Sequence, residues 1–173
     1  MTSVAILHWP CLDRSGREVA TAVTNLDLHD GARACLTYGI DTLYIVHPNP
    51  SQREFAQRIM DHWLKGFGSR YNPFRKMALE IVRVVAGLDE VRRETGAVLV
   101  GTTASFMPGC ISWAEVKRMA AARRVCLVFG TGWGMPRRLL ESFDAVVEPI
   151  AGVGGFNHLS VRCAMAVALD RIT

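Results

Sequence analysis

The segment "VCLVFGTGWGMP", residues 125 to 136, joins an apolar run to three glycines at alternate positions. The run from Val125 to Phe129 contains no polar residue, which is typical of a buried strand in a parallel sheet. Gly130, Gly132 and Gly134 follow it. A glycine-rich turn at a strand end lets backbone groups approach a ligand closely. The segment therefore predicts an α/β protein with a ligand site at the end of this strand.

The rest of the chain alternates between similar apolar runs and helical patterns. Further strands are predicted at residues 3–9, 42–48, 79–86, 97–103 and 145–150. Helices are predicted at residues 23–39, 51–66, 88–96, 112–124, 136–143 and 157–172. At 173 residues the chain has the length of one compact domain, and we expect a single domain over residues 1–173. Because most strands are continuous apolar runs, we expect a sheet that is buried on both faces. This sheet should be mostly parallel and carry helices on both faces.

Local signals add detail to this pattern. Ser51 with Glu54, and Ser112 with Glu115, have the spacing of capping boxes at helix starts. The last helical pattern, residues 157–172, is apolar nearly all round, which predicts burial on more than one side.

Residues 65–76 form the least regular stretch, and they interleave aromatic rings with cations. Such side chains stack on bases and hold phosphates. For Phe67 and Tyr71, a solvated loop whose rings anchor in the core is the favoured interpretation.

The composition excludes several classes of protein. Half of the 173 residues are hydrophobic and 21% are charged, which excludes disorder, and no apolar run approaches the roughly 20 residues that cross a bilayer. The five cysteines include no C-x-x-C pair, so we expect a cytoplasmic protein with neither disulfides nor a metal site. The net charge of +4, with 17 arginines against 3 lysines, permits a polyanionic partner. A genome that prefers arginine codons would give the same ratio.

The place of the glycines in the chain argues against a dinucleotide site. A dinucleotide-binding turn follows the first strand of its fold, whereas these glycines follow the fifth. A nucleotide-binding oxidoreductase is therefore the weakest of the alternatives. Three loops that follow strands come close together in the sequence instead, at residues 100–105, 129–136 and 148–160. All three should emerge at one edge of a parallel sheet, where they predict a small-molecule pocket built from main-chain groups.

The same stretches resemble the SPOUT, or α/β-knot, superfamily of RNA methyltransferases. The resemblance is carried by "LVFGTGWGM" (127–135), by "VEPIAGVGGFNHLSVRCAMAVALDRI" (147–172) and by residues 5–48. More narrowly, the chain is similar to the small bacterial SAM-dependent RNA methyltransferase family that also occurs fused to tRNA (guanine) methyltransferase domains. The resemblance implies a Rossmann-like sheet with a C-terminal trefoil knot, a homodimer, and S-adenosyl-L-methionine (SAM) as the cofactor. It also implies tRNA or rRNA as the substrate and no association with a membrane.

The resemblance further implies which residues bind the cofactor. The first loop would border the adenosine, the second would form the centre of the knot, and the third would close over the adenine and methionine parts. In chain order these residues are Gly101, Thr102, Thr103 and Ala104, then Phe129, Gly130, Gly132, Trp133, Gly134 and Met135, then Ile150, Gly154, Gly155, Phe156, Asn157, His158, Leu159 and Ser160.

The first helix carries the candidate catalytic residues. Asn25, His29, Asp30 and Arg33, together with Asp27, are expected to face the methyl acceptor, and residues three or four apart share a helix face. Arg33 would grip a phosphate or orient the base. Either His29 or Asp30 would accept the proton. The alternative is an exposed helix face with an ordinary pair between Asp30 and Arg33.

One departure from the superfamily pattern bears on activity. Ribose 2′-O members carry an Asn six residues before the Arg of this helix, whereas Asp27 stands there in this chain. A catalytically silent module that binds SAM or RNA as a partner domain therefore stays open as a second reading. His8, His47 and His62 have no partner at ligand spacing, and we expect them to be structural.

Overall fold

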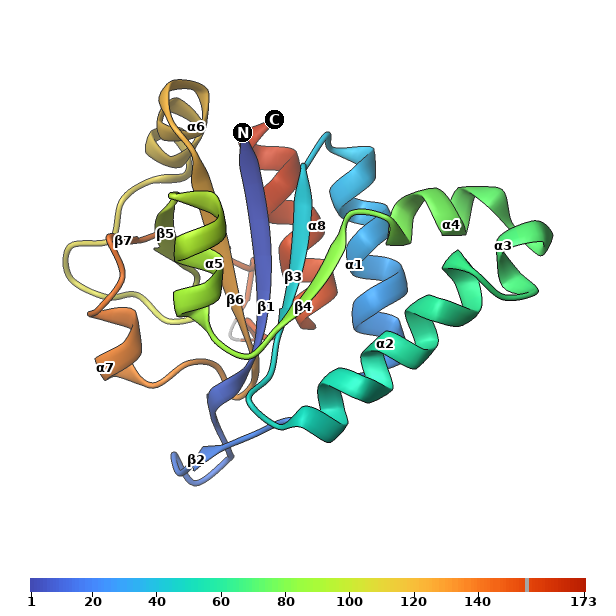
Figure 1. Ribbon diagram of the computed structural model, residues 1–173. Helices are drawn as coiled ribbons and strands as arrows, with labels where there is room; N and C mark the ends of the chain where they lie inside the picture. The colour runs from blue at the N-terminus through green and yellow to red at the C-terminus, as the bar shows by residue number, and fades with distance from the viewer. Residues whose placement is uncertain (155) are drawn as a thin grey trace.

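A computed structural model describes residues 1–154 and 156–173, and a parallel sheet forms its centre (Figure 1). Across the sheet the strands are β4 (Val82–Val85), β3 (Thr42–Val46), β1 (Thr2–Leu12), β6 (Val125–Gly132), β5 (Val98–Gly101) and β7 (Ala145–Val146). Every neighbouring pair in this order is parallel. The short strand β2 (Glu18–Val19) pairs antiparallel with the end of β1. The predicted α/β fold with a mostly parallel sheet is confirmed, and the knot stays a prediction.

Alternate residues of the central strands enter hydrophobic cores on opposite faces of the sheet. Val4 and Ile6 of β1 face the core shared with α1 (Asn25–Thr37), α6 (Trp113–Ala122) and α8 (Val161–Ile172). Ala5 and Leu7 face the core shared with α5 (Leu88–Thr95) and α7 (Arg137–Leu140). Both faces of β1 are thus buried. For this reason the strand reads as a continuous apolar run.

Capping residues determine where the helices begin. Ser112 and Glu115 form the predicted capping box at α6, and Thr24 forms one with Asp27 at α1. The capping box predicted at Ser51 is wrong. The helix α2 (Pro50–Leu64) is capped by the Asn49 side chain, which accepts a hydrogen bond from the backbone N–H of Ser51, and proline occupies the first helical position.

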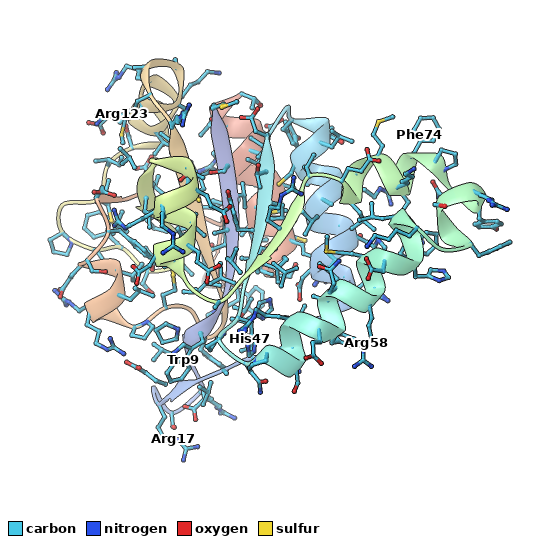
Figure 2. The ribbon with its side chains drawn as sticks, viewed as in Figure 1. Trp9, Arg17, His47, Arg58, Phe74 and Arg123 are labelled. Carbon is cyan, nitrogen blue, oxygen red and sulfur yellow. The ribbon has the colours of Figure 1, made fainter. Side chains whose placement is uncertain are left out.

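The stretch predicted to be irregular contains helical turns. It holds α3 (Gly68–Tyr71) and the start of α4 (Pro73–Leu79), joined by Asn72, whose side-chain oxygen accepts from the backbone N–H of Arg75 at 3.0 Å. With α2 these helices project beyond the β4 edge of the sheet (Figure 1), and Phe74 lies on their outer side (Figure 2). Phe67 and Tyr71 are 74% and 75% exposed. The interpretation that these rings anchor in the core is therefore wrong.

The last helix, α8, is buried on one side only. Met165, Ala168, Leu169 and Ile172 are buried at helical spacing, whereas Val167 on the other side is 36% exposed. Burial on more than one side was therefore a wrong prediction for the single chain. No helix in the described part of the chain has the length and apolar character needed to span a bilayer.

We expect Leu169→Ala to lower the free energy of unfolding by about 2–5 kcal/mol, because truncation leaves a cavity among fully buried side chains. Leu26→Ala on α1 is the matched control. Leu26 is 50% exposed, so its loss should change stability by less than about 0.5 kcal/mol. Urea denaturation followed by circular dichroism measures both, and equal effects would contradict one-sided packing of α8.

Candidate active site

The loops after β5, β6 and β7 meet at one edge of the sheet. The Asn157 side-chain N–H donates to the carbonyl oxygen of Ala104 at 3.3 Å, which joins the third loop to the first. The ring of His158 lies 6.2 Å from that of Trp133 in a T-shaped arrangement, which joins the third loop to the second. The three loops that the sequence predicted to share a site therefore lie together. Gly155 falls outside the described residues.

Hydrogen bonds within the loops fix several of the predicted cofactor residues. Thr102 donates to the carbonyl oxygen of Val128 through both its backbone N–H and its hydroxyl, each at 3.0 Å. The Thr103 hydroxyl oxygen accepts from the backbone N–H of Ser105 at 3.1 Å. Ser160 caps α8 by accepting from the backbone N–H of Cys163 at 3.3 Å. These bonds leave the side chains little freedom, so the loops present a pre-formed main-chain surface.

The second loop begins later than the sequence predicted. β6 continues to Gly132, which pairs with Leu12 near the end of β1. Gly132 has a φ of +61°, and a Cβ atom there would lie 2.9 Å from the carbonyl oxygen of Leu12. Glycine is thus required by the left-handed backbone and by the close approach of the two strands.

Large apolar side chains around the three loops are exposed. Trp133, Phe156 and Leu159 are 60%, 78% and 50% exposed, whereas Phe129 and Met135 are buried in the cores on opposite faces of the sheet. A Cβ atom at Gly154 would meet no other atom within 4 Å. Rings and aliphatic side chains with backbone groups between them form a surface that fits an adenine ring and an aliphatic chain.

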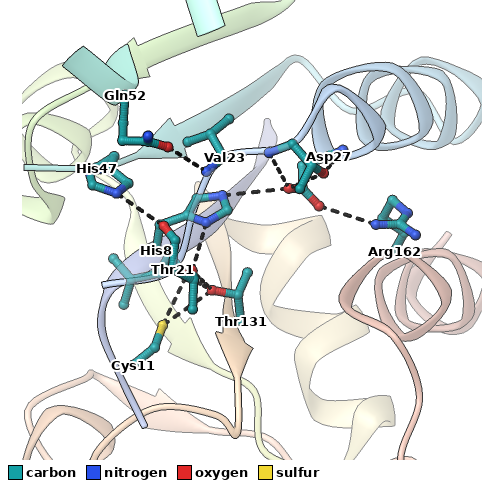
Figure 3. Close-up of polar contacts among 11 residues, drawn as sticks. His8, Cys11, Thr21, Val23, Asp27, His47, Gln52, Thr131 and Arg162 are labelled. Carbon is teal, nitrogen blue, oxygen red and sulfur yellow. Dashed lines mark hydrogen bonds and ion pairs between the residues drawn. The ribbon is translucent and has the colours of Figure 1, made fainter. Parts of the chain in front are cut away.

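A buried polar network lies where the ends of β1 and β6 meet (Figure 3). Nδ1 of His8 is 2.9 Å from the Thr21 hydroxyl, and this hydroxyl is hydrogen-bonded to that of Thr131. The Thr131 hydroxyl donates to the carbonyl oxygen of Leu7 at 3.0 Å. The Cys11 sulfur lies 3.4 Å from the same Thr131 hydroxyl. The network thus ties the start of the second loop to β1 and to the segment that leads into α1.

Asp27 extends this network to α8. Its carboxylate is 4% exposed, accepts from the backbone N–H and hydroxyl of Thr24 at 3.0 and 2.7 Å, and lies 3.4 Å from an Arg162 guanidinium nitrogen. The same carboxylate is 3.9 Å from Nε2 of His8. The prediction that Asp27 faces the methyl acceptor is therefore wrong, because capping of α1 turns its side chain inward.

Two histidines of this network are held neutral. Burial lowers the pKa of His8 to about 4, against the opposing effect of the Asp27 carboxylate. Burial also lowers the pKa of His47. His47 accepts from the backbone N–H of Asn49 at 3.0 Å and donates to the carbonyl oxygen of Thr21 at 3.1 Å, which places its proton on Nε2. By contrast, Nε2 of His8 has no hydrogen-bond partner within the described residues.

The four predicted catalytic residues line one cavity. Asn25, His29, Asp30 and Arg33 face α2 across a cavity of about 650 Å³, which His62 lines as well. Asp30 pairs with Arg162 of α8, with 3.3 Å between Oδ2 and Nε. The alternative in which Asp30 simply pairs with Arg33 is thus not what the structure forms.

His29 is the half-buried histidine of this cavity. Burial, and then the nearby Arg75 guanidinium, lower the pKa of His29. Its Nδ1 is buried and has no hydrogen-bond partner in the described parts of the chain. Over the same residues, no group of three or more His, Cys, Asp or Glu side chains is placed to hold a metal ion.

Sequence reasoning missed Thr21, Thr131 and Arg162 as members of the site. They lie before α1, at the end of β6 and in the first turn of α8, so no spacing along the chain joins them. The only signal was indirect. A buried carboxylate at a helix start needs a cation or hydrogen-bond donors nearby, and the sequence does not show which Arg supplies them.

Solved proteins described as methyltransferases share this fold. A probable methyltransferase from Bordetella pertussis has the same fold, with a TM-score of 0.67 over 99% of this chain and 91% of its own, at 17% identity. An rRNA methyltransferase from Sinorhizobium meliloti, solved with AdoMet bound, covers 99% of this chain and 55% of its own with a TM-score of 0.59 at 16% identity.

The sequence then identifies the family. Residues 1–173 match the family described as "SAM-dependent RNA methyltransferase", and the chain belongs to it. A protein from Aquifex aeolicus is 41% identical over 98% of this chain and 86% of its own length. A tRNA (guanine-N(1)-)-methyltransferase from Nitratidesulfovibrio vulgaris is 40% identical over 97% of this chain, which spans only 41% of that relative. The prediction of a SAM-dependent RNA methyltransferase is confirmed, and the reading as a silent module is not favoured.

The buried histidines predict how stability depends on pH. The unfolded chain binds a proton at His8 near pH 6.5, whereas the folded chain does so only near pH 4. The unfolded state therefore holds more protons between these values, and the free energy of unfolding falls as the pH drops through this window. We expect His8→Asn to flatten the slope. His62→Asn, at an exposed histidine, is the control and should leave it steep. Urea titrations at pH 7 and pH 5 measure both, and an unchanged slope in His8→Asn would refute this assignment.

Proposed function

We propose that this protein transfers a methyl group from SAM on the three loops to a nucleotide of tRNA or rRNA at the α1 cavity. One observation carries the proposal: Arg162, just after the third loop, contacts both Asp27 and Asp30 of α1. The cofactor loops and the cavity are thereby joined through one guanidinium. A methyl transfer needs donor and acceptor in line and close together, and this link holds their two binding regions in a set relation.

The residues of the loops fit the cofactor by their chemistry. Trp133, Phe156 and Leu159 offer apolar contacts for the adenine and the aliphatic chain, and main-chain groups of Thr103 and Ala104 offer polar ones. SAM supplies a methyl group on a positively charged sulfur, which is already a good leaving group. The protein therefore acts mainly by positioning the two reactants.

On the acceptor side, His29 is the better of the two candidate bases. It is neutral and its Nδ1 has no bond to any residue that the structure describes, whereas Asp30 is engaged by Arg162. His29 would take the proton of the attacking group as the methyl is transferred. Arg33 would hold a phosphate or orient the base, and Asn25 would complete the acceptor side of the cavity.

The proposal includes a homodimer that acts in the cytoplasm, with residues 1–173 as a single domain. The outer side of α8 supports the dimer, because Val167 is part-exposed and Leu159, just before the helix, is half-exposed. A second copy related by a two-fold axis would cover these apolar side chains and the exposed loop residues beside them.

Gly154→Val tests the cofactor site. A side chain there meets no protein atom within 4 Å, so it would fill the space proposed for SAM without disturbing the fold. Gly132 is a poorer probe, since a Cβ atom there collides with β1. We expect the affinity for SAM to fall at least about tenfold, measured by calorimetry. Gly87→Val, at another open glycine in extended backbone, is the control and should bind normally. Unchanged affinity in Gly154→Val would remove the third loop from the site.

Arg33→Ala tests the acceptor site. We expect SAM affinity to stay the same while transfer of labelled methyl groups to undermethylated tRNA and rRNA falls about 100-fold, because the acceptor loses its positioning contact. The control Arg123→Ala removes an exposed arginine at the end of α6 and should transfer at the normal rate. Full activity in Arg33→Ala would discard the proposed role of this residue.

A further inference from the structure

A groove runs along α1 toward the projecting helices. Besides the cavity between α1 and α2, a second cavity of about 400 Å³ lies between α1 and α4. Arg33 and Arg75 line both cavities, so the two are parts of one continuous surface. The far end of this surface is formed by Phe74 and Met77 of α4. The groove therefore leads from the candidate catalytic residues to the tip of the molecule.

The groove is positively charged. Arg33, Arg58 and Arg75 line it, and the one carboxylate among its described lining residues, Asp30, is already paired with Arg162. Arg58 has only a long, solvent-exposed pair with Glu54, at 3.8 Å. Residues 62–79, which form the outer wall, contain four cations and no Asp or Glu. Of these cations, Lys65 is the one paired with a carboxylate in the described structure, that of Asp61 at 3.0 Å. Such a surface attracts a polyanion.

The walls of the groove offer flat rings. The Arg75 guanidinium lies over the Trp63 ring, 4.2 Å from its centroid, and the His29 ring meets Trp63 edge-on with centroids 5.5 Å apart. Because it is stacked on Trp63, the Arg75 guanidinium is held in place and offers a planar surface of its own. The His29 ring is half-buried and lines the groove beside Trp63.

The tip beyond the groove exposes more rings. Phe74 is 80% exposed, and Phe67 and Tyr71, whose rings stack with centroids 6.0 Å apart, are about equally exposed. Figure 2 shows Phe74 on the outer side of α4, away from the sheet. These rings add almost nothing to the core. Aromatic rings beside unpaired cations are the arrangement on which successive nucleic-acid bases stack.

We propose that this groove and tip bind a single-stranded segment of RNA, with a phosphate at Arg58 and bases on the Arg75 guanidinium that is stacked on Trp63 and on the Phe74 ring. The inference rests on the proposed function and adds the surface that selects the substrate. A duplex would keep its bases stacked on one another and leave these rings without partners. A second copy of the chain does not fit the groove, because a two-fold axis would bring the same cations of both copies together.

Fluorescence anisotropy with a labelled single-stranded RNA of about 12 nucleotides and a duplex of the same sequence tests the inference, in the presence of saturating SAM. Wild-type protein should prefer the single strand. Phe74→Ala should weaken its binding about tenfold, since stacking on one ring contributes about that factor, and should leave the salt dependence unchanged. Arg58→Ala should weaken binding and reduce the slope of log K against log salt by about 0.7.

Arg58 and Phe74 are both strongly exposed, so neither variant should affect folding or SAM affinity. Arg123→Ala, at the opposite end of the molecule (Figure 2), removes the same charge and should bind RNA like wild type. Normal RNA binding by both groove variants would overturn the inference and leave the proposed function intact. Equal affinity for duplex and single strand would also overturn it, as would a change in sedimentation of Phe74→Ala, which would make the tip an interface between copies.

Failure of the proposed function has a different signature. In that case wild-type protein would neither bind any RNA nor transfer labelled methyl groups to it, whatever the state of the groove. The two hypotheses are therefore separated by the behaviour of wild type alone.

Discussion

The pairing of β6 with β1 is the interaction on which the rest of this structure depends. β6 comes late in the chain and inserts between β1 and β5, so strands from distant parts of the sequence run parallel at the centre of the sheet. Because they are parallel, their carboxyl ends share one edge. That edge receives the loops after β5, β6 and β7 and the segment before α1. The register extends to Leu12 and Gly132, and this extension brings Thr131 to Thr21, the hydrogen-bond partner of His8.

The buried polar network around Asp27 then joins the loops at this edge to α1. Asp27 would destabilise the fold by several kcal/mol if its carboxylate were buried without partners. It has the Thr24 donors at the start of α1 and the Arg162 guanidinium from α8. Arg162 also holds Asp30, whose helix lines the acceptor cavity. The loops proposed to bind the cofactor and the cavity proposed for the acceptor are thus held together by groups that cannot move apart without leaving a buried charge unpaired. The neutral histidine beneath them keeps a second charge out of the core.

The sequence alone predicted what depends on local pattern. The unbroken apolar run from Val125 to Phe129 indicated a parallel strand buried on both faces, and Ser112 with Glu115 marked a helix start that the structure has. Errors arose where a partner distant in the sequence decides the outcome. α8 is apolar all round, but only one side meets the sheet, and no periodicity shows what lies on the other. His8 seemed isolated because Thr21 and Asp27 reach its ring only where the segment before α1 folds back over the end of β1, and no spacing along the chain shows this.

The helices α2, α3 and α4 are less constrained by packing than the loops after β5, β6 and β7. Glycines such as Gly132 and Gly101 lie where any side chain would strike β1 or Phe143, so the cofactor edge tolerates little change. The rings at Phe67, Tyr71 and Phe74 are held by helices beyond the last strand and contribute almost no burial. Replacing them costs the fold little. In the division proposed here, the sheet edge supplies a constant methyl-donor site. The appended helices can then change which RNA they recognise without disturbing the β1–β6 pairing that builds it.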